Sequence, residues 1–192
     1  MGTWSPGRVR RTASSYAVRM RRLGVRMDLA PVVDLAVPGH YIDELGRSFG
    51  ADPDLVAGQA RAWRVGMQDG GVVTVLKHWP GHGGASNSHT GPARTAPLSQ
   101  LETADLVPFD RALADGAPVV MVGHLLSRGL TRRPVALALS GGESDDAADR
   151  ALALLATEQL TETLRLAVAR LELAIATGTE ATVLAPVTGA AR

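Results

Sequence analysis

Val72-Val73-Thr74-Val75-Leu76-Lys77-His78 is the stretch that decides the fold of this chain. Its first five residues are β-branched or apolar without alternation, a pattern typical of a strand that is covered on both faces. Strands of this kind belong to parallel sheets, in which crossover helices join one strand to the next. The stretch therefore predicts an α/β domain with Lys77 and His78 at the carboxyl end of a buried strand.

The segment before this strand begins with a predicted helix. Ser5 is suited to be its N-cap and Pro6 its first helical residue, and Gly24 ends it. Its expected apolar surface consists of Val9, Tyr16, Val18, Met20 and Leu23.

Two more helices are expected around the same strand. One begins at Asp52-Pro53 and closes at Gly70-Gly71, because Asp caps a helix, Pro suits its first turn and Gly ends it. The other runs from about Gln100 to Ala114, where Ser99 and Glu102 have the spacing of a capping box.

Two further strands are predicted, from Val25 to Leu35 with Asp34 at its end, and from Pro118 to Val122 before Gly123-His124. Strands that alternate with helices form either an open doubly wound sheet or a (β/α) TIM-type barrel. No glycine-rich nucleotide motif follows the first strand, which favours the barrel. In both folds, reactive side chains gather at the carboxyl ends of the strands.

The length of 192 residues suits one domain. It is below the roughly 200 residues of small complete barrels, which is consistent with an incomplete barrel. Residues 141–192 are expected to form a divergent helical segment and tail rich in alanine and leucine. Apolar residues recur there at helical spacing, for example Leu160, Leu164, Val168, Leu171 and Ile175.

Composition narrows the class of protein. No apolar run approaches the roughly 18 residues of a membrane span, and the chain has no cysteine for disulfides. The first six residues lack the core of a secretory signal, which predicts a cytoplasmic protein unless a targeting segment lies upstream. A formal charge of +1 argues against nucleic-acid binding. The arginines between residues 8 and 26 are expected to be a solvated helix face: Arg8, Arg10, Arg11, Arg19, Arg21, Arg22 and Arg26.

Histidines and the only lysine cluster after the central strand. Lys77 stands out because the chain otherwise uses arginine, and a compact ammonium can contact one hydroxyl or carboxylate. His78 and His82 have the spacing of metal ligands on a helix, but the intervening Pro80-Gly81 prevents a helix. No acidic residue lies between positions 72 and 101, so we expect neither a metal nor a cofactor. The turn around Pro80 could shape a site or simply link two elements.

These residues carry a family resemblance. Lys77-His78-Trp79-Pro80-Gly81-His82-Gly83, followed by Ser88-His89, resembles the Lys-His-Phe-Pro-Gly-His-Gly … Asp-Ser-His signature of glycoside hydrolase family 3, in its bacterial β-N-acetylhexosaminidase branch. Further segments resemble that family's landmarks over about residues 6–140: Ala30-Pro31-Val32-Val33-Asp34, Arg47-Ser48-Phe49-Gly50-Ala51-Asp52-Pro53, Asp105-Leu106-Val107-Pro108-Phe109 and Val120-Met121-Val122-Gly123-His124.

The resemblance implies a partial TIM-type barrel over residues 1–140, from an enzyme that acts on β-linked N-acetylglucosamine in peptidoglycan fragments or related glycans. It implies that Arg47, Lys77 and His78 contact the sugar, with Met121 and His124 nearby. It further implies that His89 is the general acid/base. An imidazole suits that role, because it can protonate a leaving oxygen and later deprotonate water near neutral pH.

Two departures from the family pattern bear on catalysis. Asn87 stands where the family has the Asp that orients the acid/base histidine. A comparable Asp-to-Asn change lowers turnover on the order of 10⁴-fold in a serine protease. The family's Gly-Phe-x-Gly-Val-Val-x-Thr/Ser-Asp nucleophile segment is also absent after Ser140, and Asp145 and Asp146 there suit helix capping instead. The alternative prediction is therefore a homologue that binds amino sugar without cleaving it.

Overall fold

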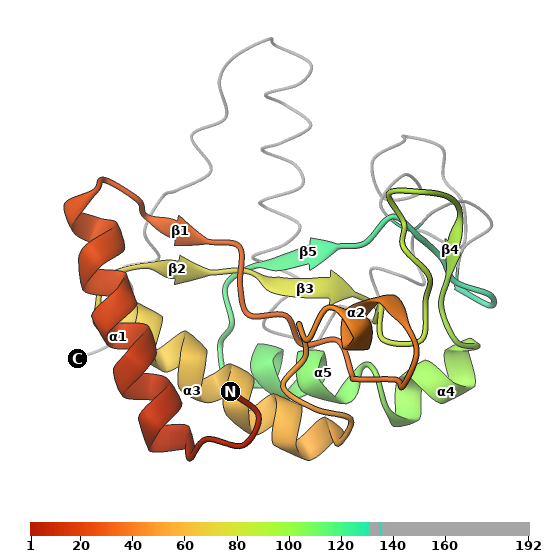
Figure 1. The fold of residues 1–192 in the computed structure, drawn as a ribbon, viewed down its shortest axis with the longest axis horizontal. Helices are drawn as coiled ribbons and strands as arrows, with labels where there is room; N and C mark the ends of the chain where they lie inside the picture. The colour runs from red at the N-terminus through yellow and green to blue at the C-terminus, as the bar shows by residue number, and fades with distance from the viewer. Residues whose placement is uncertain (131–134, 136–192) are drawn as a thin grey trace, which may run out of the picture.

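The computed structural model of the chain describes residues 1–130 and 135. In order, the elements are α1 (Pro6–Arg22), β1 (Met27–Asp28), α2 (Tyr41–Glu44), α3 (Pro53–Asp69), β2 (Val73–Thr74), β3 (Leu76–Trp79), β4 (Ala93–Arg94), α4 (Leu98–Thr103), α5 (Val107–Ala114), β5 (Val120–Val122) and β6 (Leu125–Leu126). In Figure 1 the central strands run side by side, with α1, α3, α4 and α5 along one side of them.

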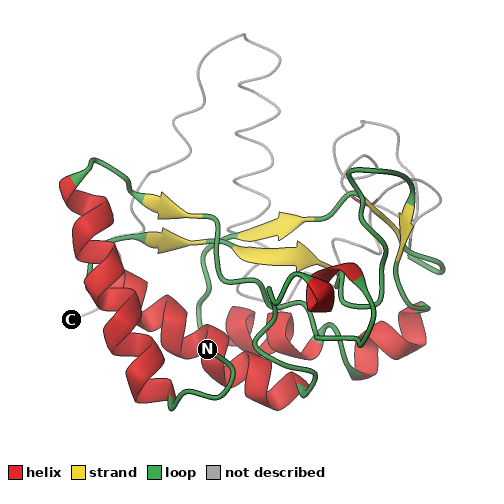
Figure 2. Cartoon of the chain, in the orientation of Figure 1, coloured by secondary structure: helices red, strands yellow, loops and turns green. Residues whose placement is uncertain are grey.

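The central strands are parallel, as predicted. β1 pairs with β2, β3 pairs with β5, and a parallel bridge between Val32 and Lys77 extends the first pairing. Figure 2 shows the helices on one side of these strands. A doubly wound sheet would carry helices on both faces, whereas a (β/α) barrel carries them only outside. The described residues thus form part of a barrel wall.

The first helix begins as predicted, with Ser5 Oγ accepting from the backbone N–H of Arg8. The prediction of its apolar face was largely wrong. The residues that it buries most deeply are Val9, Ala13 and Ala17, whereas Leu23 is 82% exposed. α3 approaches so closely that a Cβ added at Gly66 would overlap the carbonyl oxygen of Arg10. The contact between α1 and α3 therefore requires small side chains, and most of the larger apolar side chains predicted for this face are exposed.

The first predicted strand is shorter in the structure than the span from Val25 to Leu35. Regular pairing covers β1 and then only Val32. Pro31 between them has no N–H to donate to a neighbouring strand, which limits regular pairing there. The central prediction was confirmed and extends further, since the paired stretch runs through β2 and β3 to Trp79.

The predicted helix from Gln100 to Ala114 is in fact two helices, α4 and α5. Pro97 is the N-cap of α4 and makes no side-chain capping bond, so the predicted capping box of Ser99 and Glu102 is absent. Pro108 lies in the first turn of α5. A continuous helix would drive its ring into the carbonyl of Ala104, and Pro108 has no N–H to bond with it. The chain breaks there, which leaves Asp105 buried in the gap.

The core lies between the strands and the helices. Its largest fully buried side chains include Trp79, Phe109 and Leu76. A second cluster fills the space between α1 and α3. An ion pair from the buried Arg64 of α3 to Asp115 ties α3 to the end of α5.

The segment of residues 141–192 that was predicted to be helical, with Asp145 and Asp146, lies outside the described residues, so the division at residue 140 stays a prediction. In the described part of the chain, no helix is long and apolar enough to cross a membrane.

Candidate functional site

Asp34 lies at the centre of the candidate site. Its side chain is 0% exposed, and its Oδ1 accepts backbone N–H groups from His78 at 3.0 Å and from His82 at 2.8 Å. Its Oδ2 lies 2.7 Å from Nδ1 of the His78 ring. Because the carboxylate accepts, Nδ1 carries the proton and the ring is held in one orientation. We call Asp34, His78 and His82 the Asp34 cluster.

The segment of Arg47 is attached to the same cluster. The Ser48 hydroxyl lies 2.6 Å from the carbonyl oxygen of Asp34 and accepts the Gly50 N–H at 3.1 Å. Ala36 N–H also donates to the Gly50 carbonyl at 2.8 Å. These bonds fold the chain after β1 back over its own end, which brings Arg47 to the carboxyl edge of the strands.

Lys77 is half-buried beside these groups. Burial lowers the pKa of Lys77, and the charge of Arg47 lowers it further, whereas Asp28 and Asp34 raise it. The pKa of Asp28 is itself raised by burial, and its carboxylate accepts from Nε1 of Trp63 at 3.2 Å. The structure thus brings together Arg47, Lys77 and His78, the residues expected to contact a sugar.

Met121 and His124 follow from the neighbouring strand. Met121 is the register partner of Lys77 in the β3–β5 pair. Gly123 N–H donates to the carbonyl of Trp79 at 2.8 Å, and the exposed His124 comes directly after it. All five residues predicted to lie around the sugar therefore come from the adjacent strands β3 and β5, from the residues just after β5, or from the segment after α2.

The turn after β3 is folded tightly against the core. The Lys77–His78 and Trp79–Pro80 peptide bonds are cis. Gly81 has φ 131°, and a Cβ there would overlap the side chain of Asp105. A Cβ on Gly83 would overlap the carbonyl oxygen of Leu35. The glycines allow this turn to seat His82 on the carboxylate of Asp34.

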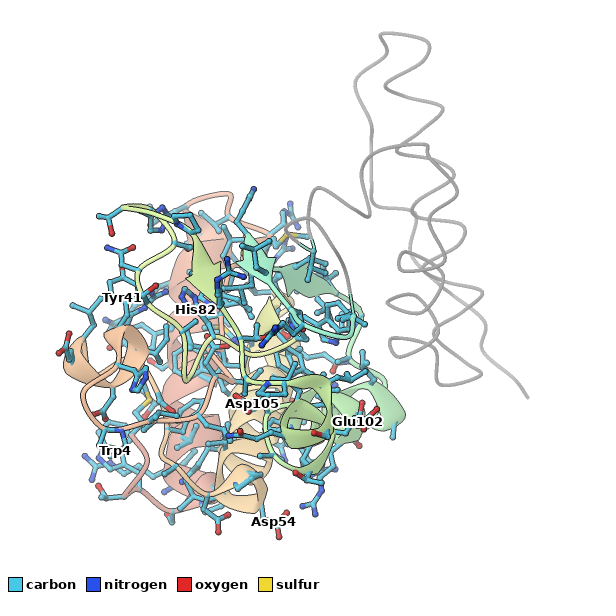
Figure 3. All side chains as sticks on the ribbon, turned by 90° about the vertical axis from the view of Figure 1, so that its right-hand side faces the viewer. Trp4, Tyr41, Asp54, His82, Glu102 and Asp105 are labelled. Atoms are coloured by element: carbon cyan, nitrogen blue, oxygen red, sulfur yellow. The ribbon has the colours of Figure 1, made fainter. Side chains whose placement is uncertain are left out.

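Asp105 is a second buried carboxyl group behind this turn. Burial raises the pKa of Asp105 to about 6, and the negative charge of Asp34 contributes in the same direction. Figure 3 shows Asp105 between the turn with His82 and the helices below it. The site therefore contains two buried carboxyl groups whose charges repel.

The loop with His89 is more open. His89 is exposed, and its backbone N–H donates to Oδ1 of Asn87 at 2.9 Å. Asn87 thus uses its acceptor on the backbone of the loop and not on the imidazole of His89. A hollow of about 490 Å³ adjoins the loop, and the residues that line it include Tyr41, Glu44, Asn87 and Arg94.

Sequence reasoning placed Asp34 at a strand end but missed its central role, and it missed Asp105 and Tyr41. The available signal was an Asp directly after a buried parallel strand, since such ends converge at one edge. No group of three His, Asp or Glu side chains suited to a metal occurs among residues 1–130 and 135.

The parallel strands, the outer helices and the polar cluster at the strand ends define a (β/α)-barrel domain with its candidate site at the carboxyl edge. Residues 1–140 match the glycosyl hydrolase family 3 N-terminal domain. The chain therefore belongs to this family, as the resemblance indicated.

Individual relatives agree with this assignment. Beta-hexosaminidase LpqI of Mycobacterium tuberculosis is 48% identical over 125 residues, which are 64% of this chain and 32% of that protein. A beta-hexosaminidase of Xylella fastidiosa is 41% identical over 112 residues, covering 57% of this chain and 33% of the relative. The solved structure of M. tuberculosis LpqI matches with a TM-score of 0.65 at 34% identity, over 92% of this chain and 62% of that one. The chain thus spans about a third of the length of the curated relatives it matches.

Proposed function

We propose that this chain binds a terminal β-linked N-acetylglucosamine residue and serves the retaining hydrolysis of that linkage, in peptidoglycan fragments or related glycans. The observation that carries the proposal is the gathering of Arg47, Lys77 and His78 around the buried Asp34. These side chains offer a guanidinium, an ammonium and an oriented imidazole at one edge of the strands, which suits a ligand rich in hydroxyl groups.

Each residue has a distinct chemical task in this proposal. His78 presents its outer ring nitrogen to a sugar hydroxyl, because Asp34 holds the inner one. Lys77 and Arg47 donate to further sugar oxygens, and Met121 and His124 line the neighbouring strand end. The pair of Arg47 and Lys77 fits an oxygen-rich ligand better than a cationic one, because a second cation would be repelled.

In this proposal His89 protonates the leaving glycosidic oxygen and later removes a proton from water. A retaining reaction also requires a carboxylate nucleophile on the opposite face of the sugar ring. Asp34 is unsuited to that task, because both of its oxygens already accept hydrogen bonds inside the fold. The described residues therefore supply sugar contacts and the acid/base group, and no nucleophile is assigned among them.

A second candidate function is amino-sugar binding without cleavage. It is favoured by the contact of Asn87 Oδ1 with the backbone N–H of His89, which leaves the ring of His89 without this side chain as an orienting partner. General acid/base catalysis depends on such orientation, whereas ground-state binding by Arg47, Lys77 and His78 does not.

Two measurements on the same preparation separate these functions. Calorimetric titration with N-acetylglucosamine measures binding, and release of a chromophore from a β-N-acetylglucosaminide measures cleavage. Binding with turnover supports hydrolysis, and binding without turnover supports the second function. A folded chain that gives neither heat nor turnover would reject both.

A pair of variants links binding to the site. Lys77→Met removes the ammonium and is expected to weaken the affinity by roughly tenfold or more, the scale of one charge-assisted hydrogen bond. Arg11→Met makes the same kind of change on the exposed face of α1 and should leave the affinity unchanged. Equal affinities for both variants would place the sugar elsewhere.

A further inference from the structure

We propose that His82 is a positioning residue that fastens the loop of His89 to the Asp34 cluster through a hydrogen bond from its ring to the backbone of Ser86. The contacts of His82 define this attachment, and its consequence for catalysis rests on the proposed role of His89 as the acid/base.

The backbone of His82 is held by the carboxylate of Asp34. Its N–H donates to Oδ1 of Asp34 at 2.8 Å, and the residue is only 3% exposed. The neighbouring Gly83 packs on the carbonyl of Leu35 without room for a side chain. The backbone of His82 is therefore part of the rigid edge of the strands.

The ring of His82 points toward the loop that carries His89. Its Nε2 lies 2.7 Å from the carbonyl oxygen of Ser86. A carbonyl oxygen can only accept, so Nε2 carries the proton, and a neutral ring then leaves Nδ1 unprotonated. Burial lowers the pKa of His82, which favours that neutral ring.

Aromatic neighbours hold the ring in this direction. The His78 ring lies edge-on to it at 5.6 Å between centroids, and the Tyr41 ring of α2 lies at 5.8 Å on a tilt. Figure 3 shows Tyr41 and His82 side by side at this edge of the molecule. Rotation of the His82 side chain away from Ser86 would disturb both contacts.

The bond to Ser86 matters because the following loop has few other attachments. Within residues 86–92, the remaining hydrogen bonds between described residues are local, from His89 and Thr90 back to Asn87. The His82–Ser86 bond is thus the one that joins this loop segment to an earlier part of the described chain. A continuous path runs from Asp34 through His82, Ser86 and Asn87 to the backbone of His89.

The test compares His82→Phe with His82→Gln in the full chain. Phe keeps a planar ring against Tyr41 but has no donor, whereas Gln has an amide donor at a similar reach. Amide hydrogen exchange at residues 86–91 is expected to be about tenfold faster in His82→Phe, the effect of losing one neutral hydrogen bond, and to be largely restored in His82→Gln. Thermal unfolding of each variant shows whether a change is confined to the loop.

Ring ¹⁵N spectra of the wild-type protein give an independent readout. They are expected to show protonated Nε2 and unprotonated Nδ1 for His82. The opposite tautomer, or equal loop exchange in His82→Phe and wild type, would overturn the inference. Should His82→Phe fail to fold, the tautomer and the exchange of His82→Gln still decide it.

Sugar binding distinguishes this inference from the proposed function. N-acetylglucosamine affinity should change less than about twofold in His82→Gln, since the backbone bond to Asp34 remains, while any turnover of His82→Phe should fall in kcat and not in KM. Absence of sugar binding in the wild type would reject the proposed function but leave the exchange and tautomer results to judge the role of His82.

Discussion

Asp34 and Asn87 are two side chains of similar shape, each beside a histidine of the candidate site, and they differ in burial and in whether they contact the ring of that histidine. Asp34 is fully buried, contacts the ring of His78 and accepts two backbone N–H groups. Asn87 is half-buried and contacts the backbone of His89. The histidine proposed to contact the sugar is thus oriented before any ligand arrives, whereas the histidine proposed as the acid/base is oriented only through the backbone of its loop.

The difference has an energetic side. A buried carboxylate is costly unless donors surround it, and Asp34 has three of them. Such a group connects the chain segments that supply the donors, so it contributes to both the fold and the site. Asn87 connects residues that are already neighbours in sequence and contributes little to the fold.

The largest expected effect is therefore the loss of the Asp34 carboxylate. Asp34→Asn should lower the free energy of unfolding by about 3–5 kcal/mol, because it removes the charge that compensates two buried N–H groups and a ring N–H. Asn87→Ala should lower it by less than about 1 kcal/mol. Urea denaturation of both variants measures the contrast, and similar losses would contradict the distinction drawn between the two sites.

Asp105, the buried carboxyl group behind the Asp34 cluster, offers a second test of how burial affects a side chain of the site. The pKa of this carboxyl is raised from 3.8 to about 6, so between these values the folded state holds a proton that the unfolded state has lost. The free energy of unfolding then falls as pH rises through this window. The loss reaches about 3 kcal/mol, from 1.36 kcal/mol for each of about two units.

Asp105→Asn removes this loss. Relative to the wild type, the variant should gain up to about 3 kcal/mol between about pH 4 and pH 7.5, measured by urea denaturation at each pH. Glu44→Gln, at an exposed carboxylate of α2, is the control and should show little pH-dependent change. A constant difference between Asp105→Asn and wild type at all pH values would show that Asp105 does not titrate in this window.

Local sequence signals predicted the parts of the fold that depend on one or two neighbouring residues. Ser5-Pro6 and Asp52-Pro53 begin helices where expected, and the β-branched run at Val72 gives the central strands. Packing between distant segments was not readable in this way. The buried face of α1 consists largely of alanines because α3 comes close, and no periodicity of large apolar residues could indicate that contact.

The site shows the same division. The strand-end rule and the family resemblance named Lys77, His78 and Arg47, and the structure brings them together. In the family motif the residue at the position of Asn87 orients the ring of the acid/base histidine, whereas Asn87 here accepts from the backbone N–H of His89. A residue's position in a motif gives its neighbourhood, whereas the atom it contacts depends on the path of the loop.

Two adjacent glycines test the boundary between the rigid turn and the open loop. A Cβ on Gly83 would overlap the carbonyl oxygen of Leu35, whereas a Cβ on Gly84 would meet nothing within 4 Å. Gly83→Ala should therefore destabilise the fold by about 1–3 kcal/mol through overpacking, and Gly84→Ala by less than about 0.5 kcal/mol. Thermal and urea unfolding of the two variants measure this. An equal loss of stability in both would move the boundary of the rigid part beyond Gly84, and no loss in either would place that boundary before Gly83.

Asn87→Asp is expected to have the smallest effect, although it restores the residue type of the family motif. Either side chain can accept the N–H of His89 through Oδ1, so the free energy of unfolding should change by less than about 0.5 kcal/mol. The affinity for N-acetylglucosamine should also stay the same, because Arg47, Lys77 and His78 are untouched.

Where a carboxylate holds a catalytic imidazole, its replacement costs on the order of 10⁴-fold in turnover. Here the side chain contacts backbone, so turnover should change by less than about tenfold, as measured with a chromogenic β-N-acetylglucosaminide. A rise of a thousandfold would mean that an acid at position 87 turns to the ring of His89, and the contrast with Asp34 would then depend on one atom of this side chain and not on the path of the loop.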